Sequence, residues 1–413
     1  MLAAALATML GGCGGGDAPP ADAGLTVYVS VPLRGPSAVD GRDIVRGAKL
    51  ALDDAGGAVG EVEVRGVYLD DTAGRGPSLG WDPAQVAENA RRATEDSTAI
   101  AYIGELESGA TRTSLPITNK AQLLHISPAS GADDLVEPFT GSGDVPTDAQ
   151  PSGIRTFGRV IPSDSAQAAA AASWARGLGA RRVGTLSDGT RASDLAVSEF
   201  AQVAADSGLA VVVRAAVGPR EDDERRLDRL DRARLQSIFY GGIFRPDEPT
   251  QGPIPTLGAP IKLLLDPPQP GGFMIGTDAL LTLANLRAVR GPTAYAPEAR
   301  LYLTSAALDT SQLPAEGQRM VTTLRRRYGA PPGRYAAYGY EAMAVVLDSI
   351  ERAGERGTER EAVLAEFLAA AERDSLLGTY SIDEVGNTTL DRLAGYRLAG
   401  DGRVTFDRPL RAR

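Results

Sequence analysis

The fold is decided by residues 25–57, which read LTVYVSVPLRGPSAVDGRDIVRGAKLALDDAGG. Residues 25–31 are rich in β-branched side chains and predict a buried β-strand. A loop containing Gly35-Pro36 follows, and the segment after it predicts a helix over 39–54. A short apolar strand followed by a longer helix is the unit from which parallel sheets are built. The stretch therefore predicts an α/β fold.

The same strand–helix unit repeats downstream. Apolar runs predict further strands over 62–69, 99–104 and 123–127, and the segments between them predict helices over 82–95 and 109–120. The first of these helices opens with Asp82-Pro83, an N-cap residue followed by the proline that the first helical position tolerates. Together these elements predict one doubly wound lobe around a parallel sheet.

A second doubly wound lobe is predicted beyond the polar stretch at 137–153, where Pro and Gly interrupt the rhythm. Asp164, with Gln167 three residues later, predicts a capped helix that runs to Gly179. Further strands are predicted over 154–161, 182–186, 209–213 and 237–242. The charge-dense run 222–235 favours a solvated helix face, and the Pro-rich run 246–260 predicts a loop.

The N-terminus differs in composition from the rest of the chain. Residues 1–13 are uncharged and apolar but shorter than the roughly 18 residues that a membrane-spanning helix needs. Such a stretch is typical of a signal peptide, and Leu10-Gly11-Gly12-Cys13 resembles the lipobox of bacterial lipoproteins. The Gly- and Pro-rich residues that follow have the composition of a flexible tether. We predict a signal peptide at 1–12, a lipid anchor on Cys13 and a tether at 13–24.

Charge and composition exclude several classes of protein. The 413 residues include 43 Lys and Arg against 53 Asp and Glu, and the net charge of -10 argues against a nucleic-acid partner. A single Cys and a single His exclude disulfide frameworks and Cys/His zinc sites. His125 lies in an apolar run, which predicts a buried strand histidine in place of a catalytic base. We expect no metal, no cofactor and no enzymatic activity.

An ordered set of short motifs runs along most of the chain. It comprises Gly35-Pro36, Gly47-Ala48, Asp70-Asp71-Thr72, Ile103-Gly104, Ile126-Ser127-Pro128-Ala129, Phe157-Gly158-Arg159, Tyr240-Gly241-Gly242, Phe273-Met274-Ile275-Gly276 and Tyr340-Glu341-Ala342. In this order, from about residue 26 to residue 407, the chain resembles the periplasmic substrate-binding proteins of branched-chain amino acid ABC transporters. The collinear order of the motifs makes the resemblance specific.

The resemblance implies a type I periplasmic binding protein fold, in which two doubly wound parallel-sheet lobes are joined by three crossovers and close on a small-molecule ligand. We expect residues 25–158 and 304–388 in lobe one, and 159–303 and 389–413 in lobe two. The implied function is that of an extracytoplasmic lipoprotein, monomeric and membrane-anchored, that delivers a solute to the permease of an ABC importer. A receptor that senses a ligand without importing it uses the same fold and stays an alternative.

Open α/β sheets bind ligands at the carboxyl ends of their strands. Ser108 comes at a predicted helix start, where its hydroxyl and the unpaired backbone amides suit a carboxylate. The resemblance implies backbone contacts from Ala129 and Gly131, and Ser130 offers the hydroxyl that Gly131 lacks where the family often has Thr. Asp278 stands where the family places the acidic residue that holds an amino group, although an N-cap role competes for it.

Departures from the family's pattern bear on the ligand. Ala192 and Ile243 stand where the family commonly has tyrosines that cover the ligand, and Arg191 offers a bidentate donor beside Ala192. We therefore expect a small polar ligand that bears a carboxylate, amino-acid-like or amide-like, in preference to leucine or valine. Four further residues near the site are predicted as exposed loop residues: Arg34, Trp81, Glu105 and Glu107.

Overall fold

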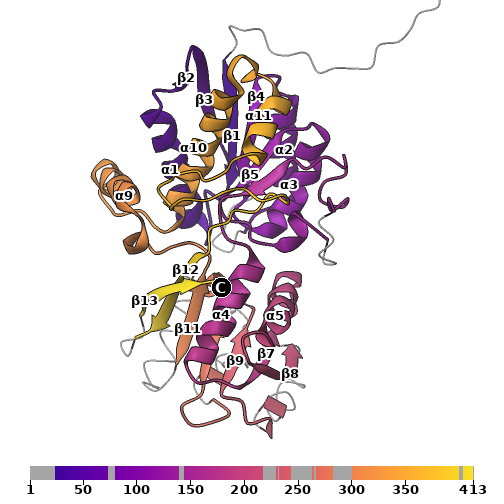
Figure 1. Ribbon diagram of the computed structural model, residues 1–413, viewed down its shortest axis with the longest axis vertical. Coiled ribbons are helices and arrows are strands. Elements are labelled where there is room, and N and C mark those ends of the chain that lie inside the picture. The colour runs from indigo at the N-terminus through magenta and orange to yellow at the C-terminus, as the bar shows by residue number, and fades with distance from the viewer. Residues whose placement is uncertain are drawn as a thin grey trace, which may run out of the picture.

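The chain forms two β-sheets with helices on their faces, stacked along the long axis of the molecule (Figure 1). The computed structural model describes residues 24–72, 80–138, 144–216, 229–230, 232–242, 263–264, 267–281, 300–399 and 403–412. No helix within these ranges is long and apolar enough to cross a membrane. Cys13, Ile243, the Pro-rich run 246–260 and most of the run 222–235 lie outside the described residues.

Lobe one is built on a six-stranded sheet in the order β2-β3-β1-β4-β5-β6. Its strands are β1 (Leu25–Val31), β2 (Ala58–Val59), β3 (Val62–Asp70), β4 (Ala99–Gly104), β5 (Leu124–Ser127) and β6 (Phe157–Arg159). All pairs are parallel except β2 with β3. The helices between the strands are α1 (Ala38–Asp54), α2 (Pro83–Glu95) and α3 (Ser108–Lys120).

Lobe two is built on a seven-stranded sheet in the order β13-β12-β11-β10-β9-β7-β8. Its strands are β7 (Arg182–Ser187), β8 (Ala210–Ala216), β9 (Ser237–Tyr240), β10 (Phe273–Gly276), β11 (Leu301–Ser305), β12 (Arg392–Leu398) and β13 (Val404–Arg411). The helices α4 (Asp164–Gly177) and α5 (Arg191–Ala204) belong to this lobe. Strands β7 to β11 are parallel, whereas β12 and β13 extend the sheet in antiparallel fashion. The predicted two-lobe α/β architecture is confirmed, with an antiparallel edge added.

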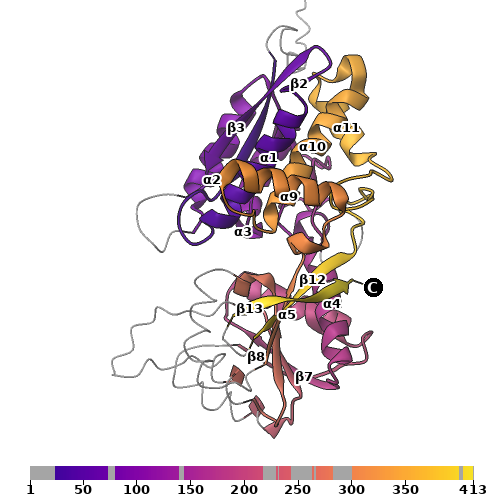
Figure 2. The same ribbon diagram turned by 90° about the vertical axis from the view of Figure 1, so that its left-hand side faces the viewer.

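The chain crosses between the lobes three times. It passes from β6 to α4, then from β11 to α9 (Ala315–Tyr328), and finally from α11 (Arg360–Leu368) to β12. Between the last two crossings, α10 (Tyr335–Ala353) packs along α1, so α9, α10 and α11 lie with lobe one (Figure 2). Arg159 ties two crossings together, because it is fully buried and donates to Asn387 Oδ1 at 2.7 Å and to the Ala132 carbonyl at 2.9 Å.

The contact between α1 and α10 shows why lobe one needs glycine at particular places. A Cβ atom on Gly47 would lie 1.9 Å from the carbonyl oxygen of Ala336, and one on Gly339 would lie 2.2 Å from that of Ile44. Both distances are shorter than any van der Waals contact, so the two helix backbones touch where these glycines face them. The Gly47-Ala48 motif in the sequence therefore reflects helix packing.

Of the two helix N-caps that the sequence predicts, one is confirmed and the other is wrong. Asp82 caps α2 as expected, with its carboxylate accepting from the Gln85 amide at 2.9 Å. The predicted cap of α4 at Asp164 is wrong by one residue, because the Ser163 hydroxyl caps this helix by accepting from the Ala166 amide. The Asp164 carboxylate therefore does not cap the helix and interacts instead with charged groups at the junction between the lobes.

His125 is the buried strand residue that its apolar surroundings predict. It has no exposed surface, and its ring nitrogens bond to the Thr118 hydroxyl and the Gly104 carbonyl, both at 2.9 Å. Because a carbonyl only accepts, Nε2 carries the proton and Nδ1 accepts from Thr118. Burial lowers the pKa of His125 to about 3, so the ring is neutral and structural at physiological pH.

Candidate ligand-binding site

The carboxyl ends of the parallel strands of both sheets meet at the junction between the lobes. In lobe one β1 lies between β3 and β4, and in lobe two β7 lies between β8 and β9. At such a position consecutive connections leave the sheet on opposite faces and open a crevice in which α/β proteins bind ligands. Each lobe thus presents its topological switch point to the other.

Ser108 is the first residue of α3, as predicted. The first intrahelical hydrogen bonds run from the amides of Ala110 and Thr111 to the Glu107 carbonyl, so the amides of Ser108 and Gly109 precede the helical ladder and can donate elsewhere. The Ser108 hydroxyl oxygen accepts from the Ala132 amide at 3.2 Å, which leaves its own hydrogen to donate. These three groups suit an acceptor such as a carboxylate.

Ala129, Ser130 and Gly131 lie in the loop after β5, next to the start of α3. Ser130 is fully buried, and its hydroxyl bonds to the Glu105 carbonyl at 3.1 Å and to the Thr111 hydroxyl at 2.7 Å. The amides of Ala129 and Ser130 donate to the Ser127 hydroxyl at 3.2 and 2.8 Å. The Ser130 side chain therefore holds the loop after β5 against the loop between β4 and α3.

Gly131 is a point of close contact between lobe one and lobe two. Its carbonyl accepts from the Asp164 amide at 2.8 Å, and a Cβ atom here would lie 2.1 Å from Asp164 Oδ1. The Thr that the resemblance leads one to expect at this position does not fit while the lobes are in contact. Glycine at 131 thus lets the first turn of α4 approach the loop after β5.

Asp278 opens the short helical turn η3 (Asp278–Leu281) directly after β10. Its carboxylate accepts from the Ser305 hydroxyl at 3.1 Å, from Gln167 Nε2 at 3.3 Å and from the Tyr335 hydroxyl of lobe one at 3.4 Å. These three donors are neutral, so they orient the carboxylate without cancelling its charge. Asp278 lies at the junction, in contact with both lobes.

Arg191, at the start of α5, forms an ion pair with Asp134 of lobe one. The distance from its Nη2 to Asp134 Oδ2 is 3.1 Å, and its side chain is 71% exposed. Asp134 also accepts from Arg112 at 2.6 Å. Arg191 therefore bridges the lobes at the outer surface of the junction, where exposed pairs contribute at most about 1 kcal/mol.

The interpretation of Glu105 as an exposed loop residue is wrong, because its side chain is fully buried beside Asp71. The Tyr102 hydroxyl donates to Glu105 Oε1 at 2.6 Å, whereas Glu105 Oε2 and both Asp71 oxygens have no hydrogen-bond partner among the described residues. Two neighbouring buried carboxylates repel each other unless one of them is protonated. Burial and the charge of Glu105 raise the pKa of Asp71, and burial raises the pKa of Glu105.

Glu107 was also expected to be exposed, and this is wrong for its carboxyl group. Glu107 precedes α3, its side chain makes no cap hydrogen bond, and its Oε2 atom is buried without a partner in the described part of the chain. Burial raises the pKa of Glu107 to about 7, against a hydrogen bond from Ser37 that lowers it. Of the other two residues, Arg34 is exposed, whereas Trp81 is half-buried.

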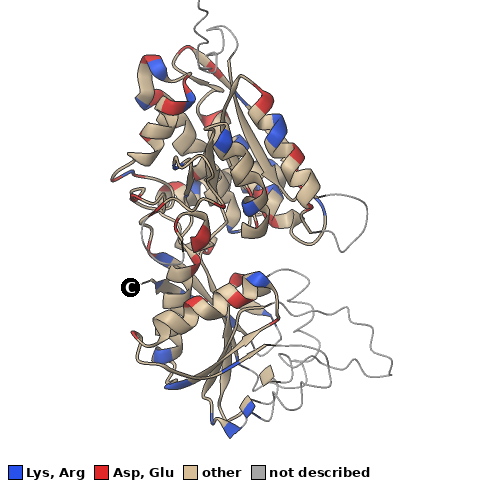
Figure 3. Ribbon diagram, turned by 90° about the vertical axis from the view of Figure 1, so that its right-hand side faces the viewer, with Lys and Arg blue, Asp and Glu red and all other residues tan. Residues whose placement is uncertain are grey.

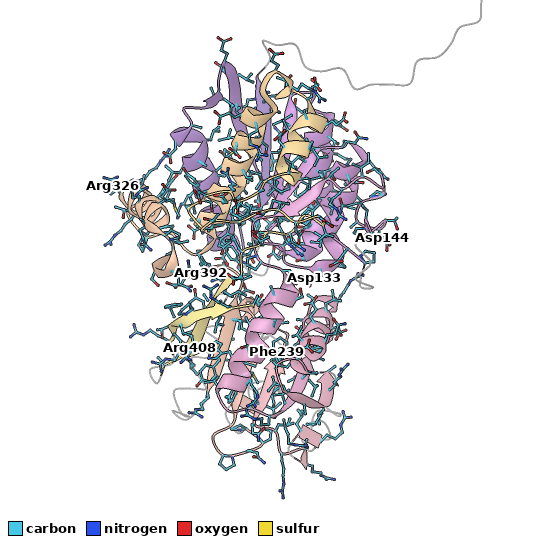
Figure 4. The ribbon with its side chains drawn as sticks, viewed as in Figure 1. Asp133, Asp144, Phe239, Arg326, Arg392 and Arg408 are labelled. Carbon is cyan, nitrogen blue, oxygen red and sulfur yellow. The ribbon has the colours of Figure 1, made fainter. Side chains whose placement is uncertain are left out.

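A second group of carboxyls spans the junction between α4, α5 and lobe one. Asp133 accepts from the Ser165 amide at 3.0 Å, and Glu199 of α5 lies against Asp133 and Asp164. Burial and these like charges raise the pKa of both Glu199 and Asp164. Figure 4 labels Asp133 at this junction, and Figure 3 shows Asp and Glu on both sides of it. Sequence reasoning missed this group because no local pattern links its members.

The acidic groups do not form a metal site. No three His, Cys, Asp or Glu side chains within the described ranges are placed to hold an ion. The site residues that the sequence singled out in lobe one lie together, whereas Asp278 of lobe two contacts lobe one through Tyr335. The arrangement suits an organic ligand held by hydrogen bonds and charge between two lobes.

Comparison with known proteins gives consistent results. The family model described as periplasmic binding protein matches residues 25–242. The leucine-, isoleucine-, valine-, threonine- and alanine-binding protein of Pseudomonas aeruginosa is 22% identical over 88% of this chain and 87% of its own length.

Solved structures share the fold. A leucine-binding protein of Thermotoga maritima superposes with a TM-score of 0.70 at 22% identity, covering 94% of this chain and 99% of its own. A solute-binding protein of an ABC transporter from R. palustris, in complex with benzoate, has a TM-score of 0.65 at 19% identity and covers 94% and 96%.

The buried pair Asp71–Glu105 predicts how stability depends on pH. Both groups have pKa values above the roughly 4 of an unfolded chain, so the folded state binds more protons. Their stabilising contribution is complete at low pH and is lost as the pH rises through the folded-state pKa values. We expect the unfolding temperature to fall from about pH 4, where the unfolded carboxyls ionise, to about pH 9, where the folded pair is ionised, and Asp71→Asn to weaken this fall.

The exposed carboxyl of Asp206 supplies the matched control. Asp206→Asn should keep the full wild-type dependence in the same thermal unfolding series. If Asp71→Asn also keeps it, the pair does not share a proton and the assignment is wrong.

Proposed function

Because the chain belongs to the periplasmic binding protein family, we propose that it is the solute-binding component of an ABC importer and that its ligand is a small polar molecule bearing a carboxylate. The family binds solutes and is not enzymatic, and its members act outside the cytoplasm. The observation that supports the proposal is that Asp278, after β10 of lobe two, accepts from the Tyr335 hydroxyl of lobe one and so lies at the junction between the lobes. Ser108 begins α3, which follows β4 at the strand ends of lobe one.

The two lobes offer complementary chemistry to such a ligand. The Ser108 hydroxyl and the amides that precede the α3 ladder are donors at a helix N-terminus, which favours an anion. Asp278 is an oriented acceptor in lobe two and favours an ammonium or amide group. A zwitterion that spans the junction engages both and stabilises the closed arrangement of the lobes.

The remaining predicted contacts belong to the same proposal. In the proposal Ala129, Ser130 and Gly131 contribute backbone groups of the loop after β5 other than the Ala129 and Ser130 amides, which donate to Ser127, and Ile243 adds an apolar contact. The ion pair between Arg191 and Asp134 joins the two lobes at the outer side of the proposed site. With Ala192 and Ile243 in place of aromatic cover, the site favours a polar ligand over leucine or valine.

We further propose that the protein is a monomer held at the outer surface of the cell membrane. Support comes from the lipobox-like tetrad that ends at Cys13 and from the tether composition that follows it. In this arrangement the chain stays near the permease that it serves.

The ligand proposal predicts affinities. Calorimetric titration of wild type with polar amino acids, leucine and aromatic carboxylates should find a polar carboxylate ligand that binds more tightly than leucine. Asp278→Asn should weaken that ligand at least tenfold, since loss of a charged partner in a closed site costs about 2 to 5 kcal/mol. Ser108→Ala should also weaken it about tenfold or more, since a hydrogen bond to a charged group contributes about 1.5 to 3 kcal/mol. Asp206→Asn should leave affinity unchanged. Tight leucine binding, or two unaffected site variants, would refute the proposal.

The anchor proposal predicts membrane partition. When cells that express the full chain are extracted with a phase-separating detergent, wild type should enter the detergent phase and Cys13→Ser should enter the aqueous phase. Wild type, expressed and extracted in parallel, is the reference against which the partition of the variant is compared. If Cys13→Ser remains in the detergent phase, Cys13 is not the anchor.

A further inference from the structure

The proposed site holds more negative charge than a simple zwitterion needs. Lobe one contributes the carboxyls of Glu107 and Asp40, the latter in the first turn of α1, and lobe two contributes Asp278. The charges of Asp40 and Asp278 act on each other, and that of Asp40 acts on Glu107. The three carboxyls thus form one electrostatic group across the junction.

A cation of lobe one faces this group. Arg334, just before α10, places its Nη2 atom 3.7 Å from Asp40 Oδ2 and its guanidinium 4.8 Å from the ring centre of Tyr335. It also lies within electrostatic range of Asp278. One guanidinium against three half-buried carboxyls leaves an excess of negative charge, which is unfavourable unless a cation or protons compensate it.

One buried acceptor of this group lacks a partner within the described ranges, independently of the charge count. It is Glu107 Oε2. Buried polar atoms in folded proteins are nearly always hydrogen-bonded, so this unpaired carboxylate oxygen indicates that a donor from a ligand completes it. The acceptor belongs to the residue immediately before Ser108.

We propose that the ligand carries a second cationic centre, an ammonium or guanidinium group, which Glu107 and Asp40 bind. This inference rests on the proposed function and specifies its ligand as a basic amino acid or a closely similar cationic compound. The ligand carboxylate lies at Ser108 and its amino group at Asp278, while the side-chain cation neutralises the lobe-one carboxyls. Glu107 is in this account a specificity-determining residue.

Lysine and norleucine isolate the cationic group, because they share the backbone and the aliphatic chain and differ in the terminal ammonium. Calorimetric titration of the whole protein should give at least tenfold tighter binding of lysine, arginine or ornithine than of norleucine. Glu107→Gln should weaken the basic ligand at least tenfold and leave norleucine affinity unchanged. Asp40→Asn should act in the same direction. Glu88→Gln, at a carboxyl whose side chain is 67% exposed, is the matched control and should change neither ligand.

The outcomes separate this inference from the proposed function. If norleucine or leucine binds wild type as tightly as every basic probe, or if Glu107→Gln and Asp40→Asn both leave the basic ligand unaffected, the second cationic centre is refuted while a solute-binding site remains. If no basic probe binds but another carboxylate does, the inference is likewise refuted. If no probe in the amino-acid and carboxylate panel binds at all, the ligand class in the proposed function fails as well. Thermal unfolding of each variant checks that it is folded.

Discussion

The contact between Gly131 and the first turn of α4 is the constraint on which the arrangement of the molecule depends. The Asp164 amide donates to the Gly131 carbonyl at 2.8 Å, and a Cβ atom at 131 would collide with the Asp164 carboxylate in its present position. This close approach turns the carboxyl ends of two separately wound sheets toward each other. Arg159 reinforces it by joining the first and third crossings through Asn387. Groups from distant parts of the chain then share one buried junction.

Bringing these edges together also brings acidic groups together. Asp133 of lobe one meets Asp164 and Glu199 of lobe two, while Asp40 interacts electrostatically with Asp278 and with Glu107. Like charges that lose water on closure repel unless protons or a bound cation compensate them. In our account a cationic ligand therefore lowers the free energy of lobe closure. The acidic residues that select this ligand are also the ones that disfavour closure without it.

Sequence patterns predicted the scaffold well because strands and helices have local periodicity. The strands at 25–31 and 99–104 were predicted at the bounds they have, and Ser108 was expected at the helix start that it occupies. The burial of Glu105 and Glu107 was missed because periodicity says nothing about a loop that folds back on a sheet end. The partnership of Asp40 with Arg334 was missed because it joins residues far apart in the chain through the packing of α1 on α10. The antiparallel pair β12 and β13 had no distinct pattern in the prediction either.

Our central claim is that the ligand binds between the lobes and draws them together. Small-angle X-ray scattering on the purified protein, with and without a saturating concentration of the ligand that titration identifies, tests it most directly. A ligand that contacts both lobes stabilises the closed state, so the account predicts a smaller radius of gyration for the complex. An unchanged radius at saturation would contradict it, because the ligand would then bind without drawing the two lobes together.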